Sequence, residues 1–161
     1  IDAVGSEPAA DELLSRAVSA VGDAIKELDS LGVKQIFVLS VPDIGRTPKF
    51  VGTAQQDRAT NLTVRYNAAV QSAINSLVLS VANVALVDTF EIFNNVITNA
   101  DQLGFTDSRN ACYNSGERRF TDECSAEGLN TFVFFDDIHP SAKTHELIGM
   151  ELATKIVSTL R

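Results

Sequence analysis

The stretch Phe132-Val133-Phe134-Phe135-Asp136-Asp137-Ile138-His139-Pro140 decides how this chain folds near its C-terminus. Four apolar residues of strand character run into a carboxylate, and His139 follows Asp136 by three positions. Pro140 is typical of the first position of a helix, so a helix is expected to begin there. The strand and the helix would hold Asp136 and His139 on one tight turn.

Such a turn suits a hydrogen bond from one imidazole nitrogen to the Asp136 carboxylate. The other nitrogen is then free to take a proton from a nucleophile. If His139 lies just before or within the first helical turn, the partial positive charge of the helix end favours a neutral ring. Asp136 compensates the charge that appears when the ring is protonated. We therefore predict Asp136 and His139 as the acid and the base of a Ser-His-Asp triad.

Two other interpretations of the same residues stay open. An Asp before a helix is also an ordinary N-cap, so the pair is compatible with a purely structural role. A metal site is the second alternative, because oxygen and nitrogen ligands fall within ten residues at Asp136, Asp137, His139 and His145. The expected helix disfavours the metal site, since His145 would lie over a turn further along and point elsewhere. We predict no metal and no organic cofactor.

Helical and strand patterns alternate upstream of this stretch. Apolar spacings of three and four residues predict helices over residues 8–31 and 55–78, and a capping box at Asp88 begins a third helix. Runs of apolar residues predict buried strands over residues 33–41, 84–87 and 131–135. This alternation is typical of a parallel α/β sheet. The last helix is expected to bury Leu147, Ile148, Leu152, Ile156 and Leu160.

The segments between these elements carry weaker signals. Residues 42–48 contain two prolines and a glycine after a predicted strand, so they form a loop and a candidate pocket wall. Ser40 lies at the end of that strand, but strand-end serines are common and no Gly-x-Ser-x-Gly elbow occurs in the chain. We expect the nucleophile to lie outside this chain. Residues 103–130 show no periodicity and are predicted to be a structureless segment, either a functional loop or an excursion stapled by its cysteines.

Length and composition exclude several classes of protein. The 161 residues, 45% of them hydrophobic, correspond to about one domain with a sizeable core. A net charge of −8 without a basic run argues against nucleic acid or an anionic membrane surface as the main partner. No apolar stretch approaches the roughly 20 residues of a transmembrane segment. The chain begins at Ile1 without a Met, which we interpret as a processed product or an excerpt of a longer protein.

Cys112 and Cys124 are the only cysteines in the chain, and they lie 12 positions apart. Their spacing fits no zinc motif, and two free thiols remain the alternative to a bridge. We predict a Cys112–Cys124 disulfide, which would stabilise the fold by about 3 kcal/mol in the chain-entropy picture. A disulfide implies an oxidising compartment, so the expected location is secreted or periplasmic.

The C-terminal residues also resemble a known family. The block Asp136-Asp137-Ile138-His139-Pro140, followed by Ser141-Ala142-Lys143-Thr144-His145, is similar to the C-terminal catalytic block of the SGNH, or GDSL, lipases and esterases. The bacterial lecithinase, haemolysin and phospholipase branch is the most similar. The resemblance extends over residues 38–48, 66–70 and 86–89, and on to residues 104–106 and 111–112.

The resemblance implies a fold and a division of the chain. It implies a flavodoxin-like three-layer α/β/α fold with a parallel sheet, to which this chain contributes the later strands and the C-terminal helix. Residues 1–161 would be the C-terminal part of a single SGNH hydrolase domain with no internal boundary.

The resemblance also implies an activity. The triad roles map onto Asp136 and His139, in a carboxylic-ester hydrolase that acts on an ester or lipid substrate through an acyl-enzyme. The family's nucleophilic Ser and its Gly and Asn oxyanion donors lie earlier in the polypeptide, and none is present here. The expected partner is therefore an N-terminal portion of the same enzyme carrying Ser, Gly and Asn. A phospholipase or lipid acyltransferase with the same triad, and a non-catalytic α/β binding module, remain alternatives.

Overall fold

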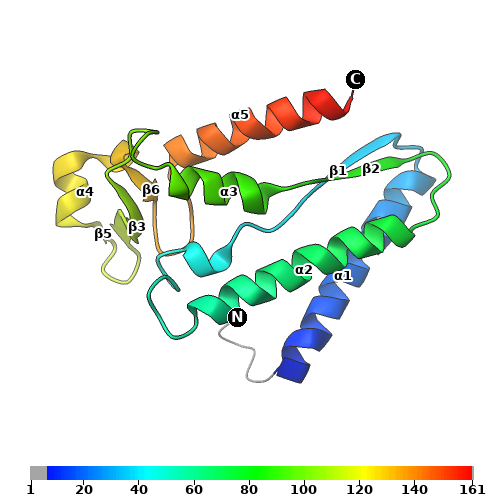
Figure 1. Cartoon of the computed structure of the whole chain (residues 1–161), viewed down its shortest axis with the longest axis horizontal. Helices are drawn as coiled ribbons and strands as arrows, with labels where there is room; N and C mark the ends of the chain where they lie inside the picture. Colours follow the sequence, from blue (N-terminus) through cyan, green and yellow to red (C-terminus); the bar gives the residue numbers. More distant parts are fainter. Residues whose placement is uncertain (1–6, 161) are drawn as a thin grey trace.

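Helices and parallel strands alternate in the computed structural model, which describes residues 7–160 (Figure 1). The predicted helices and strands upstream of residue 100 are all present, with bounds that differ by at most two residues. In chain order the elements are α1 (Glu7–Ser30), β1 (Gln35–Leu39), η1 (Ile44–Arg46), α2 (Gln56–Ser76), β2 (Asn83–Val87), α3 (Thr89–Thr98), β3 (Asp107–Ala111), β4 (Tyr113–Asn114), β5 (Arg119–Phe120), α4 (Asp122–Glu127), η2 (Leu129–Thr131), β6 (Phe132–Phe134) and α5 (Ala142–Thr159).

In the described part of the chain, the strands form two parallel pairs and one hairpin. β1 pairs with β2 in parallel, with Gln35 opposite Asn83 and Leu39 opposite Val87. β3 pairs with β6 in parallel, and β4 pairs with β5 antiparallel. The predicted parallel pairing is confirmed. Within residues 7–160 the two parallel pairs are not hydrogen-bonded into one sheet, so the three-layer arrangement stays an expectation.

Two larger apolar cores and a smaller one around the disulfide hold these elements together within residues 7–160. In the first, Ile25 of α1 and Val70 and Ile74 of α2 pack with Ile36 of β1. The second core joins α3, β6 and the partly buried apolar residues of α5. Its rings include Phe93 and Phe134, which meet edge to face at 5.8 Å between centroids. The second core therefore anchors β6, the strand that leads to Asp136.

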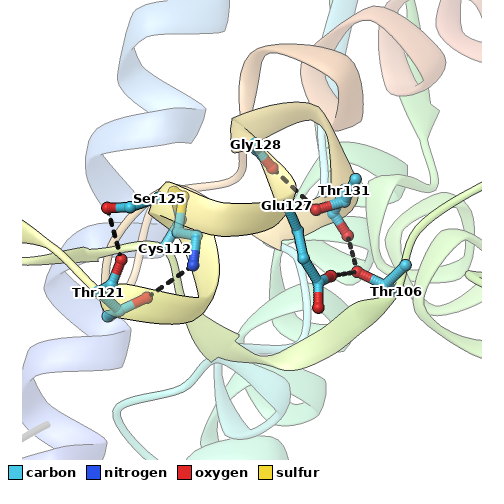
Figure 2. The surroundings of a disulfide bond; sticks show 8 residues. Thr106, Cys112, Thr121, Ser125, Glu127, Gly128 and Thr131 are labelled. Carbon is cyan, nitrogen blue, oxygen red and sulfur yellow. Dashed lines mark hydrogen bonds between the residues drawn. A yellow bond between two sulfur atoms is a disulfide. The ribbon is translucent and has the colours of Figure 1, made fainter.

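The prediction that residues 103–130 lack regular structure is wrong. This segment contains β3, the β4–β5 hairpin and α4. The predicted Cys112–Cys124 disulfide is present, and both cysteines are buried against Phe132 at the start of β6. Figure 2 shows the disulfide beside α4 and η2. These elements are too short to show an apolar period. A disulfide core and strand pairing stabilise them in place of an amphipathic face.

The prediction that the last helix begins at Pro140 is also wrong. α5 begins at Ala142, and the Oγ atom of its N-cap Ser141 accepts the Thr144 N–H at 3.3 Å. Pro140 instead forms an isolated bridge with Phe134. The Ser141 N–H and the Thr144 hydroxyl both donate to the Val133 carbonyl, at 2.8 and 2.7 Å. These bonds fix the start of α5 on β6.

The free edge of β1 and the apolar side of α5 are less buried than expected. Four of the apolar residues expected to be buried in α5 are only half-buried, and Leu160 is exposed. Among residues 7–160, β1 pairs with β2 alone, so its other edge presents unpaired backbone groups. Leu39 at the end of β1 is 50% exposed. In the part of the chain that the structure describes, no helix has the length and apolar character needed to cross a membrane.

Candidate active site

The turn between β6 and α5 brings Asp136 and His139 together. The Phe135 N–H donates to the His139 carbonyl at 2.8 Å, which closes the turn on itself. A second bond ties the turn to the rest of the fold, because the Lys49 N–H donates to the Asp137 carbonyl at 2.9 Å. The spacing in the sequence therefore predicted this pairing correctly.

The Asp136 carboxylate is held from several directions. Its Oδ1 atom accepts the N–H groups of Ile138 and His139 at 2.9 and 2.7 Å. The Nδ1 atom of His139 lies 2.9 Å from each carboxylate oxygen. The Asp136 side chain is 14% exposed, whereas that of His139 is 71% exposed. The carboxylate is thus shielded and oriented, and the imidazole ring remains open to solvent.

Opposing effects act on the pKa of Asp136. Partial burial raises this pKa, but the N–H groups of His139 and Ile138 and the His139 ring outweigh burial, and the pKa falls below its ordinary value of 3.8. Asp136 is therefore ionised at neutral pH. An ionised carboxylate beside Nδ1 favours the tautomer with its proton on Nδ1, which leaves the lone pair on Nε2.

The helix end contributes less to this site than the sequence suggests. His139 lies three positions before Ala142, the first residue of α5, and so outside the first helical turn. The field of a helix end falls off within that turn. Asp136, rather than the helix, is the main charged neighbour of the ring.

The comparison with known proteins now identifies the family. Residues 2–152 match GDSL-like Lipase/Acylhydrolase. The chain belongs to the GDSL-like lipase/acylhydrolase family. The resemblance noted in the sequence is confirmed.

The curated relatives of this GDSL-family chain come from plants and bacteria. One GDSL esterase/lipase of Arabidopsis thaliana is 25% identical over 86% of this chain and 43% of the relative. A second is 27% identical over 96% of this chain and 47% of the relative. A thermolabile hemolysin of Vibrio parahaemolyticus is 23% identical over 81% of this chain and 34% of the relative. The chain thus spans less than half the length of these relatives.

Ser40 of the GDSL-family chain has a structural role. Its side chain is buried, donates to Asp88 Oδ1 at 3.3 Å and accepts the Phe90 N–H at 3.1 Å. Its backbone carbonyl accepts the Thr89 hydroxyl. These bonds join the end of β1 to the start of α3. None of its hydrogen bonds reaches Asp136 or His139, so Ser40 is not placed as their nucleophile.

The loop over residues 42–48 is held by its own contacts. The buried Asp43 carboxylate accepts the Gly45 N–H at 3.1 Å and the Thr60 hydroxyl at 2.7 Å. Ile44 lines a small apolar cavity of about 230 Å³ against α2. A larger cavity that reaches Asp137 has no lining residue from this loop. The prediction of a pocket wall therefore holds only for the apolar cavity.

No sequence pattern indicated the residues that line this larger cavity. Most of them lie in residues 107–123, a segment without a periodic pattern. Among the residues considered for a metal site, His145 lies exposed on α5. Across residues 7–160 no group of three or more His, Cys, Asp or Glu side chains is arranged to hold a metal ion.

Proposed function

We propose that this chain is the Asp- and His-bearing part of a carboxylic-ester hydrolase that works through a Ser-His-Asp triad. The observation that carries the proposal is the position of His139 Nδ1, 2.9 Å from both oxygens of a shielded Asp136 carboxylate. Membership of the GDSL-like lipase/acylhydrolase family supports the reaction class.

His139 and Asp136 would have distinct roles in the reaction. His139 Nε2 removes the proton of a serine hydroxyl as the serine oxygen attacks the ester carbonyl. His139 then gives that proton to the departing alcohol, and the acyl group remains on the serine. His139 then activates water in the same way, and the water releases the carboxylic acid from the serine. Asp136 orients the ring and stabilises the imidazolium that forms in each step.

The serine and the oxyanion donors would come from an N-terminal portion of the same enzyme. The 161 residues contain no Gly-Asp-Ser block, and the curated relatives are more than twice as long as the part that this chain matches. The open edge of β1 and the exposed Leu39 beside it offer a surface for further strands. We infer that residues 1–161 are the C-terminal part of one hydrolase domain.

The Cys112–Cys124 disulfide supports a secreted or periplasmic location for the enzyme. The family description as a lipase and acylhydrolase favours a second candidate activity on lipid esters, as a phospholipase or lipid acyltransferase with the same triad. The two activities differ in whether water or another alcohol accepts the acyl group. Product analysis with a lipid donor and an alcohol acceptor distinguishes them.

The proposal is tested by comparing this chain alone with the complete polypeptide. The complete polypeptide should hydrolyse a short-chain p-nitrophenyl ester and be labelled on serine by a fluorophosphonate probe. Residues 1–161 alone should do neither. Activity of the monodisperse chain alone would overturn the need for an N-terminal portion. A complete polypeptide that is neither active nor labelled would favour a non-catalytic binding module.

A further inference from the structure

A cavity of about 560 Å³ lies along β3 and the β4–β5 hairpin. It reaches Asp137, which lies in the turn that carries the Asp136–His139 dyad (the dyad turn). This volume lies within the range of about 300–1,000 Å³ that is typical of small-molecule sites. The side chains that give it chemical character are Asp107, Asn110, Asn114, Ser115, Glu123 and Asp137.

The lining of this cavity is acidic. Asp107, Glu123 and Asp137 carry carboxylates, and no Lys or Arg is among the lining residues. Burial raises the pKa of Asp107, but the backbone N–H and side-chain amide of Asn110, the Arg109 N–H and the positive charge of Arg109 outweigh it and lower the pKa. The Asp107 carboxylate is therefore charged at neutral pH. The carboxylates of the lining disfavour a phosphate or carboxylate group in this cavity.

The aromatic rings of the cavity do not form a cage for an ammonium group. Tyr113 stacks on Phe135 with 5.3 Å between ring centroids and 7° between planes. The rings of Phe120 and Tyr113 meet in a T-shaped contact, with 5.4 Å between centroids. Tyr113 and Phe132 are the aromatic residues of the lining, and Phe132 is only 2% exposed. A single partly covered ring does not enclose a quaternary ammonium ligand.

The polar groups instead suit a ligand with many hydroxyl groups. Carboxylates accept hydrogen bonds from hydroxyls, and the Asn110, Asn114 and Ser115 side chains both donate and accept. Part of this capacity is used within the protein: Asn110 donates to Asp107 at 2.8 Å, and Asn114 Oδ1 accepts the Gly116 N–H at 3.0 Å. The side chains of Glu123 and Asp137 are exposed to ligand and solvent.

The wall of the cavity is joined firmly to the dyad turn. The Cys112 N–H donates to the Phe134 carbonyl at 3.2 Å, and the Tyr113 N–H donates to the Phe135 carbonyl at 2.6 Å. The disulfide fixes Cys112 to α4, as Figure 2 shows. Asp137 follows Asp136 directly, with about 3.8 Å between their Cα atoms. A ligand in the cavity would therefore lie against the turn that carries the dyad.

We propose that this cavity binds the alcohol part of the ester substrate and that this alcohol is polyhydroxylated, such as glycerol or a sugar. The inference rests on the proposed esterase function, because the alcohol leaves with the proton that His139 delivers and must lie next to the dyad turn. Asp137 and Glu123 are the specificity-determining carboxylates in this assignment.

The test compares esters that share a butyryl group and differ in alcohol, with the complete polypeptide as enzyme. The glycerol and glucose esters should exceed the ethyl ester, whose alcohol has no further hydroxyl group, in kcat/KM by about tenfold or more, since a hydrogen bond to a charged group discriminates by about that factor. Asp137→Asn and Glu123→Gln should each lower the ratio of glucose ester to p-nitrophenyl ester by about tenfold. Glu146→Gln, an exposed carboxylate on α5 outside the cavity, should leave the ratio unchanged.

A second measurement does not depend on the folding of any variant. Free glucose should inhibit hydrolysis of the p-nitrophenyl ester competitively, and ethanol at the same concentration should not. Preference for the ethyl ester, absence of inhibition by glucose, or ratios that do not change in the two variants would overturn the inference while the p-nitrophenyl activity upholds the esterase. Failure to hydrolyse any of the esters would overturn both.

Discussion

The Nδ1 atom of His139 lies 2.9 Å from both carboxylate oxygens of Asp136. The same carboxylate accepts two backbone N–H groups of the turn, from Ile138 and His139. The turn therefore orients Asp136 independently of the imidazole ring. The dyad is preorganised by local backbone geometry, as a site that stabilises transient charge requires.

Replacing His139 by Ala should remove almost all ester hydrolysis. Without the imidazole no group of the dyad accepts the serine proton, so kcat/KM should fall by about 10³-fold or more in the complete polypeptide. His145→Ala is the matched control, because His145 is the other histidine and lies exposed on α5. Steady-state kinetics check both variants. Near-normal activity in His139→Ala, or equal losses in the two variants, would remove His139 from the mechanism.

Replacing Asp136 by Asn should lower kcat much more than it changes KM. The Asn oxygen can still accept the backbone N–H groups of the turn, but the side chain no longer compensates the charge on His139. The fall in kcat should be on the order of 10⁴-fold, by analogy with the same change in other triads. Binding of a substrate analogue should change little. A variant with substantial kcat would show that the carboxylate is only an N-terminal cap of the turn.

The stabilising effect of Asp136 should be lost in acid. Its pKa is lowered in the folded state, so folding is favoured while the carboxylate is ionised above the unfolded value of 3.8. As the pH falls below 3.8 towards the folded pKa, the unfolded chain takes up the proton first and this contribution disappears. The difference in Tm between wild type and Asp136→Asn should therefore narrow from pH 7 to pH 3. A difference that stays constant would contradict the assigned direction of the shift.

Replacing Gly45 by Ala should destabilise the fold. A Cβ atom at this position would lie 2.6 Å from the Gln56 carbonyl oxygen and also overlap the Thr60 hydroxyl. The backbone must shift, which should cost roughly 1–3 kcal/mol of unfolding free energy. Gly149→Ala is the contrasting change, because no atom lies within 4 Å of its added Cβ and the site is helical. It should stabilise by up to about 1 kcal/mol, measured by chemical denaturation.

Removing the disulfide should cost stability and loosen the cavity wall. The bridge closes a loop with a sequence separation of 12, so the double change Cys112→Ala and Cys124→Ala should lower the unfolding free energy by about 3 kcal/mol. The amides of residues 112–128 should exchange faster in hydrogen exchange. The parallel β1–β2 pair supplies the internal control, since its amides should exchange as before. Uniformly faster exchange would show that the bridge stabilises the whole fold instead.

The sequence predicted the elements whose burial follows a regular spacing. Helix α1 was expected over residues 8–31 and spans Glu7–Ser30, and β2 was expected over residues 84–87 and spans Asn83–Val87. Periodic apolar residues report directly which face of an element is buried. The pairing of Asp136 and His139 was also predictable, because the two residues are only three positions apart in the chain.

Residues 103–130 show where this reasoning fails. β3 consists of Asp107–Ala111, a largely polar run that pairs with β6 across more than twenty residues of sequence. Nothing in the sequence of β3 itself predicts a strand, because pairing with β6 and the nearby disulfide stabilise it. The start of α5 was misplaced for a related reason. The Ser141 cap was a local signal, but the bridge between Pro140 and Phe134 depends on β6 lying alongside.

The amino-acid sequence by itself thus determined the family, the alternation of helices and strands, and the turn on which a carboxylate meets an imidazole. These features depend on residues close in the chain or on periodic burial. Only the tertiary structure decided that Tyr113 stacks on Phe135 and that an acidic cavity reaches Asp137. Contacts between segments distant in sequence, once the disulfide and strand pairing bring those segments together, create a cavity that no local pattern encodes.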